Sequence, residues 1–213
     1  MEKRILCYGD SNTWGYIGGV GERFARDVRW TGRLQMLLGD EYTVIEEGLN
    51  SRTTVWEDPV EQHKNGYTYL MPCLQTHRPL DLVIIMLGTN DLKRRFHVPA
   101  RDIAQGAANC AKLALQSGSG HKKGAPKVLL VSPPLLGNNL DANYFIETFE
   151  PDAVEQSKRF AYWYRTFAEQ LGIGFLDAAL YTKTGEGDAV HIDAESHARL
   201  AGALYAKIKE MGV

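Results

Sequence analysis

The most restrictive feature of the sequence is the run of six apolar residues at positions 82–87. A strand with no polar position is typical of the centre of a parallel sheet, where helices cover both faces. Shorter apolar runs occur at residues 4–8, 42–46, 127–131 and 174–176, and longer segments of helical periodicity alternate with them. This alternation predicts an α/β fold of three layers, with a five-stranded parallel sheet between two layers of helices.

Apolar residues three and four positions apart predict the helices that connect these strands. Trp30, Leu34 and Leu38 define one such face, and Asp193 is placed to cap the last helix. Two further helices are expected at residues 99–117 and 154–171. Residues 14–29 and 50–80 show neither the spacing of a helix nor the pattern of a strand. We therefore expect them to form loops over a functional site or contacts between subunits.

Length and charge exclude several classes of protein. The chain has 213 residues, and no linker-like segment or internal repeat divides it, so one domain over residues 1–213 is expected. With 24 basic and 26 acidic residues the net charge is -2, which gives no basic surface for nucleic acid. No run of eighteen apolar residues is present, and we therefore expect no contact with a membrane.

The first residues and the cysteines favour a cytoplasmic protein. The charged residues at positions 2–4 lead directly into the first strand, without the apolar stretch of a signal peptide. Cys7, Cys73 and Cys110 are odd in number and widely spaced, a pattern that favours reduced thiols over a disulfide framework.

Candidate functional residues follow the predicted strands. In parallel sheets of this kind, ligands bind at the carboxyl ends of the strands. The first strand is followed by Gly9-Asp10-Ser11, the central strand by Gly88-Thr89-Asn90-Asp91, and Asp188-Ala189-Val190-His191 precedes the last helix. We expect these segments to converge on one site.

The residue types in these segments match nucleophilic catalysis. A serine hydroxyl needs an adjacent base, and an imidazole base needs a carboxylate to orient it. Ser11, His191 and Asp188 supply these three roles of a catalytic triad, and the side-chain amide of Asn90 is suited to stabilise an oxyanion.

Each segment also has a purely structural interpretation. Gly-Asp-Ser is a common turn after a strand, and Asn90 and Asp91 are ordinary turn residues. His191 is also compatible with a surface position near a helix start. Asp10 and Asp91 are expected to make local hydrogen bonds, although an acidic pair also suits a metal site or acid-base chemistry. The ordered combination of all the segments favours the catalytic interpretation.

These segments resemble the SGNH (GDSL) hydrolase family, in which blocks containing Ser, Gly, Asn and His occur in this order. The resemblance implies a flavodoxin-like fold and acyl-enzyme chemistry without cofactor or metal. It also implies that Ser11 attacks the ester, His191 transfers the proton and Asp188 orients the imidazole.

Within this family, the sequence is similar to the arylesterase and acyltransferase branch at residues 4–11, 27–32, 46–49 and 82–91. That similarity implies a small-molecule ester substrate, acyl transfer to alcohols or peroxide, and a homo-oligomer. The oxyanion donors are then the N-H groups of Ser11 and Ser51 with Asn90, although Gly48 is an alternative to Ser51. Asp10, Asn12 and Trp14 are expected to border the substrate pocket.

Three alternatives remain at this point. A carbohydrate O-acetyl esterase uses the same chemistry, and Trp14, Trp56 and Tyr67 could stack on a sugar or an aryl ring. A non-catalytic module could bind an anion or nucleotide at the Gly9 turn, although no G-x-G-x-x-G or P-loop spacing is present. A metal-dependent phosphoesterase is disfavoured because the six histidines do not cluster with carboxylates at ligand spacing.

Overall fold

The central sheet has five strands, all parallel. The computed structural model describes residues 2–140, 145 and 147–213. Its strand order is β2-β1-β3-β4-β5, which is the flavodoxin-like order and confirms the predicted fold class. The strands are β1 (Lys3–Gly9), β2 (Tyr42–Gly48), β3 (Leu82–Met86), β4 (Lys127–Ser132) and β5 (Gly174–Asp177).

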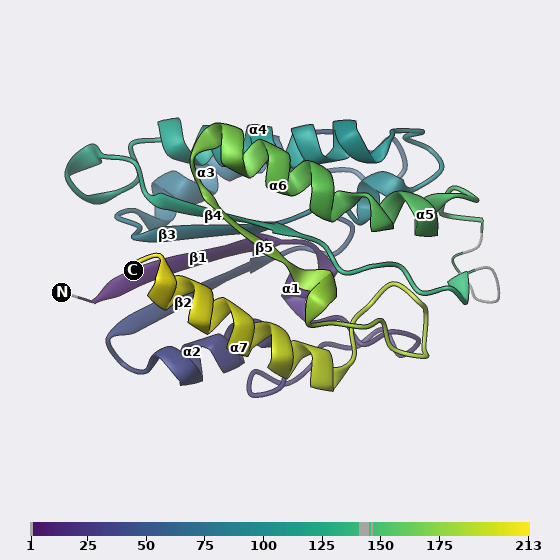
Figure 1. Cartoon of the computed structure of the whole chain (residues 1–213), viewed down its shortest axis with the longest axis horizontal. Helices are drawn as coiled ribbons and strands as arrows, with labels where there is room; N and C mark the ends of the chain where they lie inside the picture. The colour runs from purple at the N-terminus through teal and green to yellow at the C-terminus, as the bar shows by residue number, and fades with distance from the viewer. Residues whose placement is uncertain (1, 141–144, 146) are drawn as a thin grey trace.

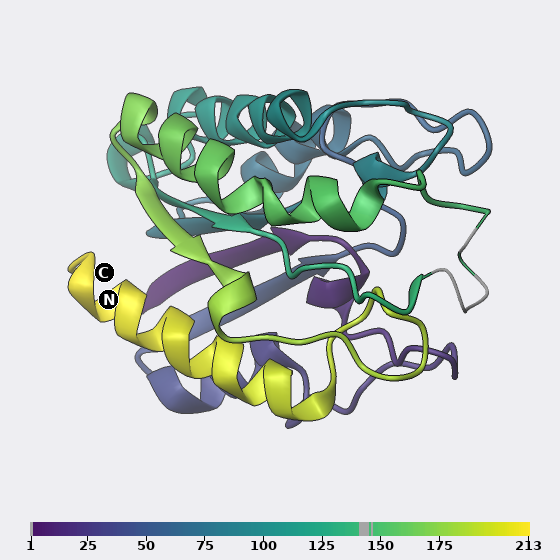
Figure 2. The ribbon, with the colours of Figure 1, turned by 45° about the vertical axis from the view of Figure 1, so that its right-hand side comes forward.

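Helices cover both faces of this sheet. In Figure 1, α3, α4, α5 and α6 lie above the sheet and α2 and α7 below it, and Figure 2 shows the same layers from a second angle. The helices are α1 (Ser11–Trp14), α2 (Trp30–Leu38), α3 (Gly66–His77), α4 (Ala100–Gln116), α5 (Ala153–Lys158), α6 (Phe160–Leu171) and α7 (Ala194–Glu210). Short 3-10 turns are η1 (Asn90–Leu92), η2 (His121–Lys123) and η4 (Ala178–Leu180). No helix in the described part of the chain is long and apolar enough to span a bilayer.

The alternation of side chains along each strand produces two hydrophobic clusters. Leu6 and Tyr8 of β1 pack in the cluster under α3, α4 and α6, whereas Ile5 and Cys7 pack in the cluster against α2 and α7. Both faces of the central strand β3 are therefore buried, which is the physical reason for its uniformly apolar sequence.

The main difference from the sequence-based prediction is α3, which lies within the segment expected to be a loop. Pro72 stands inside this helix and has no N-H to donate, which argues against a helix, although Leu70, Cys73 and Leu74 are buried at helical spacing. The helix is stabilised at its start by Asn65, whose side chain accepts a hydrogen bond from the Thr68 N-H at 3.2 Å. The expected helix at 154–171 is divided into α5 and α6 at Arg159.

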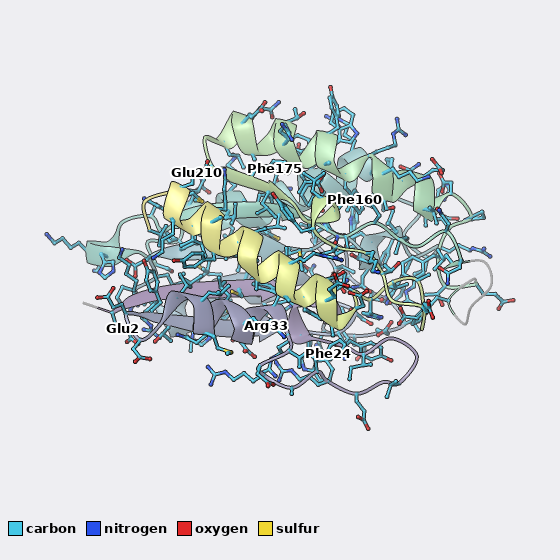
Figure 3. All side chains as sticks on the ribbon, turned by 60° about the horizontal axis from the view of Figure 1, so that its bottom comes forward. Glu2, Phe24, Arg33, Phe160, Phe175 and Glu210 are labelled. Atoms are coloured by element: carbon cyan, nitrogen blue, oxygen red, sulfur yellow. The ribbon has the colours of Figure 1, made fainter. Side chains whose placement is uncertain are left out.

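A buried histidine joins the two helices of the lower layer. His197 of α7 accepts a hydrogen bond through Nδ1 from the backbone N-H of Trp30 at the start of α2, at 3.2 Å. Its ring meets that of Phe24 edge to face, with centroids 5.1 Å apart. Figure 3 shows Phe24 and Arg33 beside α7. Burial lowers the pKa of His197 to about 3, so the side chain is neutral and acts as a packing residue.

Two glycines, one in α2 and one in α7, allow a test of how closely these helices are packed. A Cβ added to Gly32 of α2 would lie 1.8 Å from the backbone oxygen of Arg26, whereas one added to Gly202 of α7 would meet nothing within 4 Å. Because alanine favours the helix over glycine, we expect Gly202→Ala to stabilise the fold by about 0.5–1 kcal/mol. Gly32→Ala should instead destabilise it by roughly 2 kcal/mol or more, since backbone must move. Urea unfolding of both variants measures the difference, and equal effects would contradict it.

Candidate active site

Ser11 lies directly after β1, at the carboxyl edge of the sheet. Gly9 ends the strand where α1 packs closely on it, because an added Cβ would lie 2.0 Å from Thr13 Oγ1. Asp10 then caps the single turn α1, because its Oδ1 accepts a hydrogen bond from the Asn12 N-H at 2.9 Å. This turn presents the Ser11 hydroxyl to a cavity at the edge of the sheet.

His191 and Asp188 come from the loop before α7 and meet Ser11 there. His191 Nε2 lies 2.8 Å from Ser11 Oγ, and His191 Nδ1 lies 2.5 Å from Asp188 Oδ2. The other carboxylate oxygen of Asp188 accepts the N-H groups of Val190 and His191, at 3.0 and 2.9 Å. Ala189 has a φ of 59°, which closes this tight turn. The three side chains expected to form a triad are therefore in one hydrogen-bonded chain.

The electrostatics of Asp188 suit the orientation of an imidazole. Burial opposes ionisation of this carboxyl, but hydrogen bonds from the His191 side chain and from the backbone outweigh it and lower the pKa of Asp188. The carboxylate is thus ionised and able to stabilise positive charge on His191.

Asn12 connects the Ser11 turn to the His191 loop. Its Oδ1 accepts the Ile192 N-H at 3.1 Å, and its Nδ2 donates to the Val190 carbonyl at 3.4 Å. The bonds are made to the residues on either side of His191, so Asn12 holds the loop at the distance that the Ser11 contact requires. Asn12 therefore lies behind the site.

Ser51 and Asn90 line the same cavity as Ser11 and His191. Asn90 begins η1 after β3, and its Nδ2 donates to the Arg52 carbonyl at 3.1 Å. Ser51 has a φ of 66°. Within the described residues, the backbone N-H groups of Ser11 and Ser51 donate no hydrogen bond to another protein group. These N-H groups and the amide of Asn90 are the donors available to an oxyanion.

Gly48, the alternative donor, has a different structural role. It ends β2, where an added Cβ would lie 2.2 Å from the backbone nitrogen of Trp14. It borders a neighbouring cavity together with Glu47 and Tyr69, not the cavity at Ser11. Close packing of β2 on α1 thus explains why position 48 is a glycine.

The Ser11 cavity has a volume of about 330 Å³ and a lining of two kinds of side chain. Some of the lining side chains are aromatic or apolar, and others, called the polar wall below, are polar or charged. The Tyr16 ring lies 4.3 Å from the His191 ring, measured between centroids. The lining residues are Ser11, Tyr16, Asn50, Ser51, Glu61, Asn90, Lys93, Arg95, Phe145, Thr148, Phe149, Val190 and His191.

The structure brings only part of the predicted pocket to this cavity. Among the described residues, Asp10, Asn12 and Trp14 do not line it. Asp10 and Asn12 are buried behind Ser11, and the Trp14 ring packs under the Arg23 guanidinium at 5.1 Å. Trp56 and Tyr67 also lie outside the lining.

Several lining residues were not predicted from the sequence. Lys93 and Arg95 follow the Gly88–Asp91 segment closely, so their proximity to that segment was an available signal. Phe145, Phe149 and Glu61 lie in long connections without periodicity, and no local pattern indicates that they approach Ser11.

Two buried acids support the site from below. Asp91 accepts hydrogen bonds from the Thr54 N-H at 3.0 Å and the Thr54 hydroxyl at 2.5 Å, which anchors the chain that follows Ser51. Burial raises the pKa of Asp91 to about 7, and burial likewise raises that of Asp10 to about 6. Asp10 makes the local hydrogen bond that the sequence suggested, whereas the side chain of Asp91 bonds Thr54, which is distant in the sequence, so that expectation was wrong for Asp91.

One histidine lies in a group of three potential metal ligands, which the spacing of the histidines in the sequence did not indicate. His77 Nε2 lies 2.8 Å from Glu47 Oε1, and the ligand atoms of Glu47, Cys73 and His77 all lie within 4.8 Å of one another. Cys73 and His77 lie one turn apart on α3, and the fold brings Glu47 of β2 to them. They form the one group of potential metal ligands found in the described residues, and none of them lines the Ser11 cavity.

Comparisons with known proteins agree with this geometry. Residues 7–202 match the model of the GDSL-like lipase/acylhydrolase family. The inhibitor-bound aryl esterase of M. smegmatis superposes with a TM-score of 0.92 at 42% identity, covering 98% of this chain and 99% of that one. Est24, a carbohydrate acetylesterase from Sinorhizobium meliloti, gives a TM-score of 0.93 at 39% identity, covering 99% and 100%. A search of curated proteins found no match.

The chain therefore belongs to the GDSL-like lipase/acylhydrolase family, and its structural neighbours support esterase activity. The order of the Ser, Asn and His segments along the sequence is thus the order of a known hydrolase family, on the flavodoxin-like fold described above.

The buried acid Asp91 generates a pH prediction. Burial raises its pKa from 3.8 to about 7, so between these values the folded state holds a proton that the unfolded chain has lost. The contribution of Asp91 to stability therefore falls as pH rises from about 4 to 7. Relative to Asp91→Asn, the native protein should lose up to about 4 kcal/mol over this range. Urea unfolding at several pH values measures this, and parallel pH profiles would contradict it.

Proposed function

We propose that the protein is a serine esterase that cleaves short-chain acyl or aryl carboxylic esters through an acyl-enzyme. The observation that carries this proposal is the hydrogen-bonded chain from Ser11 Oγ through His191 to Asp188 at the edge of a cavity. Similarity to aryl esterase and carbohydrate acetylesterase structures supports the same class of reaction.

In the first half of the reaction, Ser11 Oγ attacks the ester carbonyl carbon while His191 Nε2 accepts the hydroxyl proton. The carbonyl oxygen becomes negatively charged and receives hydrogen bonds from the N-H groups of Ser11 and Ser51 and from Asn90 Nδ2. When this intermediate collapses, the bond to the alcohol oxygen breaks and His191 returns the proton to the leaving alcohol.

In the second half, water replaces the alcohol. His191 takes a proton from the water as its oxygen attacks the acyl carbon, and collapse of the second intermediate releases the carboxylic acid and restores the Ser11 hydroxyl. An alcohol or peroxide in the place of water would give acyl transfer by the same steps. Asp188 stays ionised and stabilises the imidazolium throughout.

A carbohydrate O-acetyl esterase is the second candidate, and the polar wall of the cavity favours it. Asn50, Glu61, Lys93 and Arg95 lie on this wall and offer hydrogen-bond donors and acceptors to the hydroxyls of a sugar. The aromatic ring of Tyr16, which also lines the cavity, could contact either a sugar face or an aryl group.

The nucleophile is tested by Ser11→Ala. The hydroxyl is the attacking group, so hydrolysis of p-nitrophenyl acetate should fall at least about a thousandfold, with unchanged unfolding temperature. Labelling by a fluorophosphonate should disappear in the same variant. Ser117→Ala, at the end of α4, is the matched control and should keep both properties. Full activity in Ser11→Ala would refute the proposed function.

The substrate class is tested by a panel of acetylated sugars and aryl acetates of matched leaving-group reactivity. If the polar wall binds the alcohol part of the ester, the native protein should have a higher kcat/KM on the acetylated sugars than on the aryl acetates. Arg95→Leu should lower that value about tenfold more for sugars than for aryl acetates, the difference expected for one hydrogen bond to a charged group, and its unfolding temperature is measured alongside because Arg95 also pairs with Asp58 and Glu61. Equal loss on both substrate series would favour the aryl-ester assignment.

A further inference from the structure

The group of Glu47, Cys73 and His77 lies away from the Ser11 cavity, between β2 and α3. Cys73 and His77 are four positions apart on α3, a spacing that places two side chains on one face of a helix. His77 Nε2 lies 2.8 Å from Glu47 Oε1. The carboxylate oxygen, the thiol sulfur and the imidazole nitrogen of the group all lie within 4.8 Å of one another.

The sheet directs Glu47 toward this helix. Glu47 pairs in register with Tyr8 of β1, and side chains at paired positions point to the same face of a sheet. The Tyr8 hydroxyl donates at 2.7 Å to the carbonyl of Gly66, the first residue of α3. The face of β2 that carries Glu47 is therefore the face that α3 covers, and the carboxylate meets the C-terminal end of that helix.

The separations suit a single zinc ion. Zinc binds thiolate sulfur at about 2.3 Å and imidazole nitrogen or carboxylate oxygen at about 2.0–2.2 Å, usually in tetrahedral geometry, so its ligand atoms are about 3.5 Å apart. The contact of 2.8 Å between His77 and Glu47 is shorter than this, and no pair of ligand atoms in the group exceeds 4.8 Å. Small side-chain rotations therefore suffice to place all three atoms around one ion.

The donor types and their charges also favour zinc. Thiolate and imidazole are ligands of zinc and related transition metals, whereas Mg²⁺ and Ca²⁺ prefer oxygen. A thiolate and a carboxylate together carry two negative charges, which balance a divalent ion. The C-terminal end of α3 adds the negative end of a helix dipole. The neighbouring guanidinium of Arg52 is directed at the backbone carbonyl of Glu47, so it leaves the carboxylate to His77.

The group is open to solvent on one side. Cys73 is 1% exposed, whereas the side chains of Glu47 and His77 are 20% and 24% exposed. Glu47 also borders a cavity of about 580 Å³ together with Pro72, the residue before Cys73. This cavity gives an ion a path to the group and has room for a water molecule as a fourth ligand.

We propose that Glu47, Cys73 and His77 bind one zinc ion, with water as the fourth ligand. On binding, the Cys73 thiol releases its proton to solvent and His77 coordinates as the neutral imidazole. None of the three residues lines the Ser11 cavity, so the ion takes no part in the ester cleavage proposed above, and the inference does not depend on that function. Because its ligands come from β2 and α3, bound zinc joins the helix to the sheet.

Binding is measured on the native chain, without a histidine tag, after treatment with EDTA. Equilibrium dialysis against zinc chloride should give one zinc ion per chain. The dissociation constant should be below about 1 µM, which allows for one protein ligand fewer than in a structural zinc site. Co²⁺ in place of zinc should produce a sulfur-to-metal charge-transfer absorption, the signature of a thiolate ligand. Absence of bound zinc, or a cobalt complex without this absorption, would overturn the proposal.

Variants locate the ion. Cys73→Ala and His77→Ala should each weaken zinc binding at least about a hundredfold, since even the loss of an outer-shell partner costs ten- to hundredfold. His121→Ala is the matched control, because His121 pairs with Asp81 at 3.3 Å outside the group of metal ligands. Its affinity should equal that of the native protein. His77 is partly exposed, so native affinity in His77→Ala would refute the site even if Cys73→Ala failed to fold.

Thermal unfolding tests whether the ion joins β2 to α3. Zinc at a hundredfold excess over its dissociation constant should raise the Tm of the native protein and of His121→Ala by roughly 5–10 °C. His77→Ala should show no such increase. An equal increase in His77→Ala would place the zinc elsewhere. No increase in the native protein would mean that the contact of Glu47 and His77 is only a structural pair, and either result contradicts the proposal.

Discussion

The parallel direction of the five strands is the constraint on which the site depends. Because all the strands point the same way, their carboxyl ends lie at one edge, and the register places Gly9 of β1 beside Gly48 of β2 and Met86 of β3. The chain leaves these neighbouring positions toward Ser11, Ser51 and Asn90, respectively. Ser11 and Asn90, which are 79 positions apart in the sequence, thereby line one cavity. A sheet with mixed directions would separate them.

Short polar contacts convert this proximity into defined geometry. The Asp188 carboxylate binds the backbone of its own turn as well as the His191 ring, so orientation of the imidazole and closure of the loop have the same cause. Asn12 then ties that loop to α1. Glu61, which lines the same cavity, forms ion pairs with Lys93 and Arg95. Preorganisation of this kind is what acyl transfer needs.

Much of the fold could be predicted because burial on both faces of a strand demands an apolar sequence. Residues 82–87 show this requirement directly, and helical periodicity located α2, α4 and α7 with Asp193 as cap. The helix α3 was not predicted, since Pro72 within it argues against a helix, and packing of its buried face and the Asn65 cap stabilise it nevertheless. The group of Glu47, Cys73 and His77 was missed for a related reason, as Cys73 and His77 lie on this same helix and Glu47 joins them from β2, which is distant in sequence.

By itself, the sequence determined the layer order, the parallel sheet and the segments that carry Ser11, Asn90 and His191, because these depend on local composition and on strand ends. Only the tertiary structure decided that Ser51 rather than Gly48 faces the cavity, that Asn12 lies behind the site, and that Glu61, Lys93 and Phe145 form its walls. The physical reason is that side-chain direction in irregular segments is set by contacts with distant residues, such as the Asp58 and Arg95 pair that orients Glu61. The sequence of an irregular segment has no hydrophobic periodicity from which such contacts can be predicted.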